Sequence, residues 1–291
     1  METDRLEPPL DDMEGKSSQI YDGISSYGSF SPVNSFFRMP LAWRFTRAPA
    51  GVEVFFTTRR GGASAPPFDS LNLGFHVGDN PELVIRNRTT VSEICGFDPA
   101  SITAPRQRHT GAVRLVEQEK EIGAGADREE SVFDPCDGLV TAFRYVPLLL
   151  NFADCLPVVL ATGAPRPAVA VLHAGRRGLM EGVIAGGVAL MTGLGAKPAG
   201  ITAALGPAIG PCCYEVGPEI SRQFEARFGR EAVQGESVDL AAAAIIDLKK
   251  TGLAPANIHL LDICTCCDKD FFSYRRDGTT GRHAAVAWIS R

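Results

Sequence analysis

Apolar and polar positions along the chain fall into two alternating patterns. Short runs rich in Val, Ile, Leu and Phe predict buried strands, and longer segments with apolar residues at helical spacing predict helices. The predicted strands are residues 52–58, 112–116, 137–142, 146–152, 156–161, 168–173, 201–206, 258–262 and 284–289. The predicted helices are residues 81–96, 179–193, 219–229 and 239–252.

End signals support these helices. Pro81 occupies a first-turn position, and Asp239 and Gly252 are placed to cap the last helix at its two ends. Ile220, Phe224 and Phe228 share one face of the helix over 219–229.

The type and order of the strands predict the fold class. Several strands are apolar throughout rather than alternating, which indicates a sheet covered on both faces. Five strands follow one another between residues 113 and 172 without a helix, which argues against a doubly wound fold. We therefore expect a layered α/β sandwich that forms one domain over residues 39–291.

Residues 1–38 differ from the rest of the chain. They are acidic, rich in Ser, Gly and Pro, and have no positively charged start followed by an apolar segment. We interpret them as a disordered extension without a secretory signal, and we expect a cytoplasmic protein. Its oligomeric state cannot be predicted from the sequence.

Charge and cysteine content narrow the function classes. The 291-residue chain has a net charge of −5, so neither a nucleic-acid footprint nor a basic membrane-binding surface is expected. Eight cysteines in a chain without an export signal indicate reduced thiols or metal ligands rather than disulfides.

Cys155 and His173 are the first candidates for chemistry. Cys155 directly precedes one predicted strand and His173 ends another, and parallel neighbouring strands would bring them together. They would then be a nucleophile and its base, two ligands of Zn²⁺, or two buried residues without a task. His109, in a polar turn, would add a third ligand and leave a fourth position open, as in catalytic zinc sites.

The segment after His173 adds positive charge. Gly175 and Gly178 would let the chain turn sharply and expose amide groups, and Arg176 and Arg177 lie between them. This arrangement suits an anion, although a solvent-facing arginine pair would give the same pattern.

Six separated motifs resemble one family. They are FTTRRGGASAPPFDSLNLGFHVGDNPELVIRNR, DGLVTA, NFADCLPVVLA, VLHAGRRG, LGPAIGPCCYEVG and DICTCCDKDFFSYRRDGTTGR, in order from about residue 50 to the end. The chain is similar to the laccase-domain family, also called multicopper polyphenol oxidase-like or peptidoglycan editing factor, whose members are purine nucleoside phosphorylases.

The resemblance implies a fold, a reaction and a site. The fold is a layered αββα sandwich with mixed sheets. The reaction converts adenosine, inosine or 5′-methylthioadenosine and phosphate to the free base and ribose 1-phosphate, with adenosine deamination as a further activity. Zn²⁺, or alternatively Cu²⁺, would be held by His109, Cys155 and His173.

Further residues of the implied site are polar. Arg59, Asn72 and Arg177 correspond to the family's substrate- and phosphate-binding positions. The resemblance also places two acids, Asp137 and Asp154, in the neighbourhood of the metal ligands, and they are candidates for acid–base catalysis because the reaction needs a proton carrier.

This chain departs from the family's pattern around two ligands. Arg108 and Thr110 flank His109 where the family has Val and Gly, and Arg176 stands where it has Trp. The ligands remain, so these changes bear on substrate preference rather than on the chemistry.

Two other functions stay open. Cys155 and His173 would suit an amide hydrolase that edits peptidoglycan precursors. A copper polyphenol oxidase is disfavoured, since such enzymes need many histidines and the chain has five.

The remaining cysteines and histidines receive no role. A second, structural zinc at Cys264, Cys266 and Cys267 or at the Cys212–Cys213 pair is conceivable, but the C-x-C-C run does not match the C-x₂-C spacing of zinc ribbons, so we do not favour it. His76, His259 and His283 have no evident partner. The arginines of FFSYRRDGTTGR would face an anion or solvent.

Overall fold

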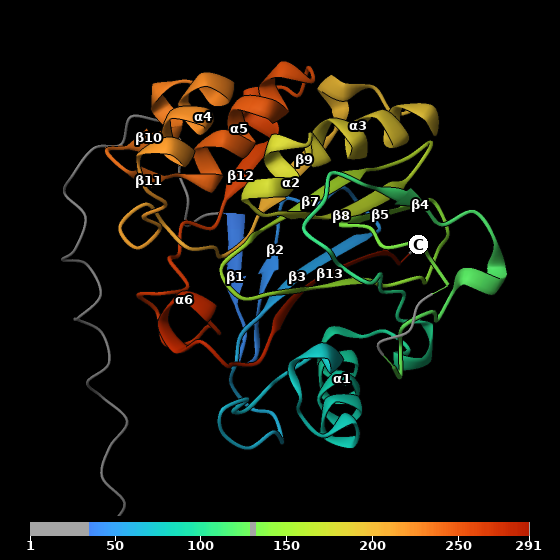
Figure 1. Cartoon of the computed structure of the whole chain (residues 1–291). Coiled ribbons are helices and arrows are strands. Elements are labelled where there is room, and N and C mark those ends of the chain that lie inside the picture. The colour runs from blue at the N-terminus through green and yellow to red at the C-terminus, as the bar shows by residue number, and fades with distance from the viewer. Residues whose placement is uncertain (1–34, 129–131, 291) are drawn as a thin grey trace, which may run out of the picture. The chain divides into compact units, whose positions relative to one another are not determined.

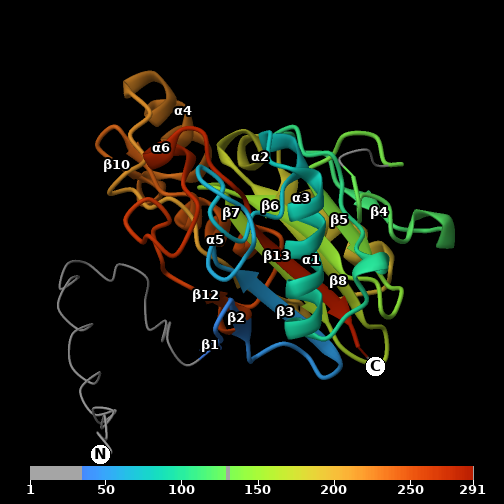
Figure 2. The same cartoon turned by 90° about the horizontal axis from the view of Figure 1, so that it is seen from below.

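Two β-sheets pack face to face in this computed structural model, which describes residues 35–128 and 132–290 (Figures 1 and 2). Helices cover the outer faces of both sheets, so the expected αββα sandwich with mixed sheets is confirmed. Of the extension expected over 1–38, residues 1–34 lie outside the described residues. Phe36–Arg38 form strand β1.

The first sheet has five antiparallel strands. Their order is β1, β2 (Ala42–Phe45), β3 (Val52–Thr57), β13 (His283–Ile289) and β6 (Leu148–Phe152).

The second sheet has six strands and is mixed. Its order is β12 (Ile258–Leu260), β9 (Thr202–Leu205), β7 (Leu156–Thr162), β8 (Ala168–Ala174), β5 (Gly138–Thr141) and β4 (Arg114–Leu115). The β12–β9 and β4–β5 pairs are parallel and the others antiparallel. Strands β10 (Val233–Gln234) and β11 (Ser237–Val238) form a separate hairpin.

The main core lies between the sheets. Phe56 and Leu150 of the first sheet pack with Val159 and Val171 of the second. Strands β7 and β8 are buried at every position, as their uninterrupted apolar sequences predicted.

Helices bury the outward-facing side of each sheet. Helix α1 (Pro81–Cys95) packs Val91 and Cys95 against Phe55 and Trp288 of the first sheet. Helices α3 (Val183–Gly193) and α5 (Leu240–Lys250) cover the second sheet (Figure 1). Helix α4 (Pro218–Phe228) packs on α5, and α6 (Tyr274–Asp277) is a single turn before β13.

The structure corrects two predicted elements. The helix expected over 179–193 is divided into α2 (Arg176–Met180) and α3, because Gly182 adopts a left-handed conformation with φ 83°. The strand expected over 112–116 keeps only the short β4.

No helix within residues 35–128 and 132–290 is both long and apolar enough to cross a bilayer.

Candidate metal centre and its cationic pocket

Cys155 and His173 are brought together by an antiparallel pair of strands, not by the parallel pair expected from the sequence. Cys155 directly precedes β7, and His173 lies near the end of β8, where it is paired with Pro157. In an antiparallel pair the start of one strand meets the end of the other. The register therefore places the thiol and the imidazole at one end of the second sheet.

His109 reaches the same place from the loop before β4. Its backbone adopts a positive φ of 61°, which is uncommon for a residue with a side chain. The Asp137 carboxylate holds this conformation, since it accepts hydrogen bonds from the backbone N–H groups of Arg108 (3.0 Å), His109 (2.9 Å) and Thr110 (2.7 Å). Asp137 is fully buried at the start of β5.

The three side chains offer a metal three ligand atoms. The nitrogens of His109 and His173 and the Cys155 sulfur lie within 4.8 Å of one another. His173 Nδ1 lies 2.7 Å from Asp137 Oδ1, which directs Nε2 toward the other ligands. Such a carboxylate partner is typical of metal-bound histidines. The donor set fits a divalent ion, and three protein ligands leave one position for another molecule.

Gly175 leaves room for this centre. A Cβ atom at this position would lie 2.7 Å from the Cys155 sulfur. Its φ of −72° is open to any residue, so the glycine is required by the close approach rather than by the sharp turn that the sequence suggested.

The ionisation of these groups is strongly perturbed. Burial raises the pKa of the Cys155 thiol, but the imidazoles of His173 and His109 outweigh that effect and lower it to about 6. Burial alone would lower the pKa of His173, but Cys155 and Asp137 raise it to about 9. The pKa of Asp137 falls to about 2, because its hydrogen bonds with His173 and backbone amides outweigh burial. The protein therefore favours a thiolate at Cys155, which is the form that binds metal.

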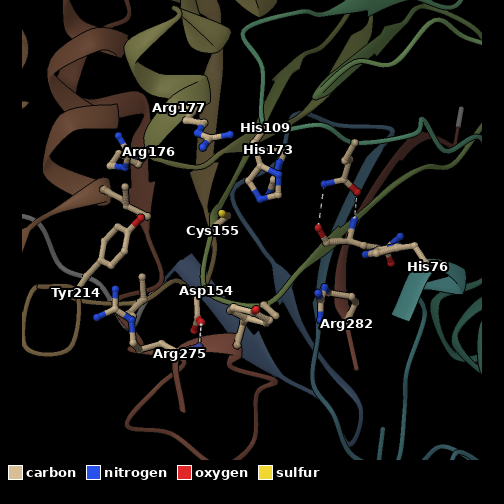
Figure 3. A pocket seen from close by; sticks show the side chains of 16 residues that line it. His76, His109, Asp154, Cys155, His173, Arg176, Arg177, Tyr214, Arg275 and Arg282 are labelled. Atoms are coloured by element: carbon tan, nitrogen blue, oxygen red, sulfur yellow. Dashed lines mark hydrogen bonds between the residues drawn. The ribbon is translucent and has the colours of Figure 1, made fainter. Parts of the chain in front are cut away.

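A cavity of about 570 Å³ opens in front of the three ligands (Figure 3). Arginine side chains line it from three parts of the chain: Arg176 and Arg177 of α2, Arg275 of α6, and Arg282 before β13. None of the four forms an ion pair with an acid within the part of the chain that the structure describes. The pocket is therefore cationic and suits an anionic ligand.

The arginine that replaces the family's Trp is part of this pocket. Arg176 interacts with the hydroxyl of Tyr214, and the Arg275 guanidinium lies 5.3 Å from the centre of the Tyr214 ring. Figure 3 shows Tyr214 between the two arginines, across the cavity from the histidines. Burial and the neighbouring Cys155 raise the pKa of Tyr214, so its hydroxyl stays protonated.

Two residues expected to bind substrate do not line the cavity. Arg59 contacts Asp69 and Asp277 and covers the Phe272 ring. The Asn72 amide is fully buried and accepts the backbone N–H of Arg282. Arg59 and Asn72 thus support the segments that carry pocket residues, while Arg177 lines the cavity as expected.

The carboxylate oxygens of the two candidate acid–base residues already accept hydrogen bonds from other groups of the protein. Asp137 lies behind His173 and is not among the lining residues. Asp154 does line the cavity, but it accepts hydrogen bonds from the Thr265 hydroxyl (2.8 Å) and the Arg275 backbone N–H (2.7 Å). Both carboxylates therefore help to position other groups of the site.

Sequence reasoning missed several lining residues. His76 faces the cavity, and burial together with Arg282 lowers its pKa to about 4, so it is neutral. Gln107 exchanges two hydrogen bonds with the Asn151 backbone, at 2.9 and 2.8 Å. The Asn151 side-chain oxygen is buried without a hydrogen-bond partner among the described residues. Arg275 and Arg282 also line the cavity, and both belong to the motif FFSYRRDGTTGR. The sequence alone could not distinguish this motif from a solvent-exposed loop.

Comparisons with known proteins agree with this geometry. The family model described as multi-copper polyphenol oxidoreductase laccase matches residues 53–290. The chain is 35% identical over 247 residues to a purine nucleoside phosphorylase of Corynebacterium glutamicum, covering 82% of this chain and 95% of that protein. It is 39% identical over 246 residues to a purine nucleoside phosphorylase of Streptomyces griseus, covering 80% and 93%.

A solved structure supports the same relationship. The crystal structure of YlmD from Geobacillus stearothermophilus superposes with a TM-score of 0.81 at 34% identity, covering 88% of this chain and 99% of that one.

Proposed function

Because this chain belongs to the multi-copper polyphenol oxidoreductase laccase family, several of whose members are named purine nucleoside phosphorylases, we propose that it cleaves purine nucleosides with phosphate. One observation carries the proposal: a three-ligand metal centre opens into a cavity lined by four arginines. The products would be the free base and ribose 1-phosphate, or 5-methylthioribose 1-phosphate from 5′-methylthioadenosine.

The arginines would hold the phosphate. Guanidinium groups bind phosphate oxygens in pairs and stay charged at any physiological pH. Arg177 lies beside the histidines, whereas Arg176 and Arg275 lie on either side of Tyr214 across the cavity (Figure 3). A phosphate bound between them would present an oxygen to C1′ of the sugar.

The purine would lie against the metal centre and Tyr214. Phosphorolysis forms a bond from a phosphate oxygen to C1′ and breaks the bond from C1′ to N9, whose electron pair leaves with the purine. Zn²⁺ bound to His109, Cys155 and His173 would supply Lewis acidity for this departure. The Asn151 oxygen, which has no hydrogen-bond partner among the described residues, would accept a hydrogen bond from the base, and the protonated Tyr214 hydroxyl would donate one.

Adenosine deamination is a second reaction that the same centre suits. It needs a water molecule beside a metal and a proton carrier on the cavity wall. Tyr214 is better placed for that proton than Asp137 or Asp154, whose oxygens are already engaged. Release of inosine without phosphate would distinguish this reaction from phosphorolysis.

Product analysis tests the proposal. The purified protein is incubated with adenosine, inosine or 5′-methylthioadenosine, with and without phosphate, and free base and sugar 1-phosphate are measured. We expect phosphate-dependent release from at least one nucleoside, and release that is roughly 10³-fold slower from His173→Ala. Arg177→Ala should raise the KM for phosphate roughly tenfold, the loss of a charged hydrogen bond, whereas Arg86→Ala, an exposed arginine on α1, should not. Absence of phosphate-dependent release from all three nucleosides would refute the proposal.

One observation favours a different reaction. Cys155, His173 and Asp137 are arranged like a nucleophile, a base and the carboxylate that orients it. An amide hydrolase acting on peptidoglycan precursors would use them without a metal. Purified protein without zinc, with amidase activity that thiol alkylation abolishes, would support the hydrolase over the phosphorylase. The pocket adds no support for a copper oxidase, because blue-copper sites use an axial methionine and no methionine within the described residues lines the cavity.

A further inference from the structure

Four cysteines outside the pocket converge from two loops. Cys212 and Cys213 follow β9, and Cys264 and Cys267 follow β12. All four sulfurs lie within 4.8 Å of one another. We call these residues the four-cysteine cluster. It is distinct from the metal centre and lies close to the surface, with Cys212 and Cys267 exposed.

The spacing of the sulfurs matches coordination of one ion. The Cys212–Cys264, Cys212–Cys267 and Cys213–Cys267 sulfurs are 3.6, 3.7 and 3.4 Å apart. A tetrahedral zinc with bonds of about 2.3 Å separates its sulfur ligands by about 3.8 Å, whereas a disulfide requires about 2.05 Å. The thiols are free, and these three separations are close to those of zinc ligands and far from that of a disulfide.

The sequence spacing agrees once Cys266 is set aside. Interpreting residues 264–267 as C-x-C-C concealed the fact that Cys264 and Cys267 are themselves separated by C-x₂-C, the spacing of zinc knuckles. Cys266 does not belong to the cluster. The argument against a second metal rested on the C-x-C-C interpretation, and it does not apply to Cys264 and Cys267.

One backbone N–H group near the cluster supports a thiolate at Cys264. The Gly210 N–H lies 3.2 Å from the Cys264 sulfur, to which it donates a hydrogen bond. A Cβ atom on Gly210 would lie 3.3 Å from the Cys212 sulfur, so the glycine allows the loop to approach this closely. Ala208 pairs with Cys264 as an isolated bridge, which fixes the two loops against each other. Hydrogen bonds of this kind orient and stabilise metal ligands.

We propose that Cys212, Cys213, Cys264 and Cys267 bind a second Zn²⁺ in a closed, structural site. Four soft thiolates select Zn²⁺ among the common divalent ions of the cell. Four protein ligands leave no open position, so this ion takes no part in substrate chemistry. The proposal does not depend on the reaction that the pocket performs.

The second zinc would brace one wall of the pocket. Tyr214 directly follows Cys213, and Thr265, between two of the ligands, donates its hydroxyl to Asp154. The Arg276 guanidinium donates to the carbonyl oxygens of Thr265 (2.9 Å) and Cys266 (3.1 Å), which joins the knuckle to α6. Tyr214, Asp154 and α6 all contribute to the pocket.

Metal stoichiometry tests the proposal. Protein purified in reductant, loaded with Zn²⁺ and dialysed is analysed for zinc per chain. We expect two zinc ions in the wild type, one in His109→Ala/His173→Ala and one in Cys264→Ser/Cys267→Ser. Cys266→Ser is the matched control in the same loop and should keep both. With Co²⁺ in place of Zn²⁺, His109→Ala/His173→Ala should retain the intense thiolate charge-transfer absorption of a four-sulfur site.

Two results would overturn the proposal. One is a single zinc in the wild type that His109→Ala/His173→Ala removes completely. The other is a disulfide among the four cysteines in the reduced, zinc-loaded protein, detected by mass spectrometry without reductant. Should Cys264→Ser/Cys267→Ser fail to fold, the zinc content and cobalt spectrum of the wild type and of His109→Ala/His173→Ala still decide.

Discussion

The metal centre and the four-cysteine cluster are built from similar ligands but in opposite ways. The metal centre has two imidazoles and one thiolate, faces a cavity and is surrounded by arginines. The four-cysteine cluster has cysteine side chains alone, and its four sulfurs lie within 4.8 Å of one another. An open position permits a metal to act on a substrate, whereas a complete set of protein ligands confines it to holding the chain together.

The two clusters also differ in what positions them. Strand register places Cys155 and His173, and a fully buried carboxylate fixes His109. The four-cysteine cluster rests on loops joined by an isolated bridge. A catalytic centre needs ligands held before the metal binds, while a structural ion organises the loops that bind it.

The largest expected difference is in catalysis. His173→Ala removes a ligand of the open site, and we expect loss of several kcal/mol of transition-state stabilisation, or roughly 10³-fold in kcat/KM. Cys264→Ser removes a ligand of the closed site. We expect it to act mainly on stability, so the melting temperature should fall while kcat changes little. Steady-state kinetics and thermal unfolding of both variants measure this. Equal losses of kcat would contradict the division of roles.

The fold was largely predictable because burial is recorded in the sequence. The uninterrupted apolar runs of β7 and β8 predicted a sheet covered on both faces, and α1 begins at Pro81 as predicted. Strand direction was not predictable, because apolar runs carry no information on whether neighbours are parallel. The break at Gly182 depends on packing that one helical pattern does not reveal.

The ligands were predictable from residue type, but the pocket was not. Cys155 and His173 stood at the ends of apolar runs, where chemistry is expected, and His109 stood in a polar turn before a predicted strand. Arg59 and Asn72 were assigned by resemblance, yet their side chains are used inside the fold. Arg282 and Tyr214 reach the cavity because distant loops fold together, and no local pattern records that.

Asp137 tests the support of the metal centre. Asp137→Asn keeps the shape of the side chain but replaces one carboxylate oxygen by an N–H₂ group. In the wild type the backbone N–H groups and the His173 imidazole contact the carboxylate, so in the variant the N–H₂ group must face one of these donors. We expect metal affinity to fall 10- to 100-fold, measured by competition with a chelator. Asp134→Asn is the control, since Asp134 is 82% exposed and forms a surface ion pair with Arg114. Unchanged metal affinity in Asp137→Asn would contradict the idea that a buried carboxylate holds the ligands of the metal centre in place.

Gly175 tests whether space at the metal centre matters. Gly175→Ala would place a Cβ atom 2.7 Å from the Cys155 sulfur, so the loop must shift at a cost of about 1–3 kcal/mol. We expect weaker metal binding at the centre and an intact four-cysteine cluster, measured as zinc retained against a chelator. Gly193→Ala, at the end of α3 with nothing within 4 Å of the added atom, should change neither.

The smallest effect concerns the link between the two clusters. Thr265→Val keeps the volume of the side chain but removes the hydroxyl that donates to Asp154. The cost should be about 1 kcal/mol, at the low end for a buried hydrogen bond to a charged group, because the cavity can supply a water to the freed oxygen. We expect both metals to remain and the KM for nucleoside to rise severalfold, with kcat little altered. Thr90→Val on α1, which loses only a hydrogen bond to the Arg86 carbonyl, is the control. A rise in KM confined to Thr265→Val would show that the closed site shapes the open one through Asp154, whereas equal KM values would leave the two clusters independent.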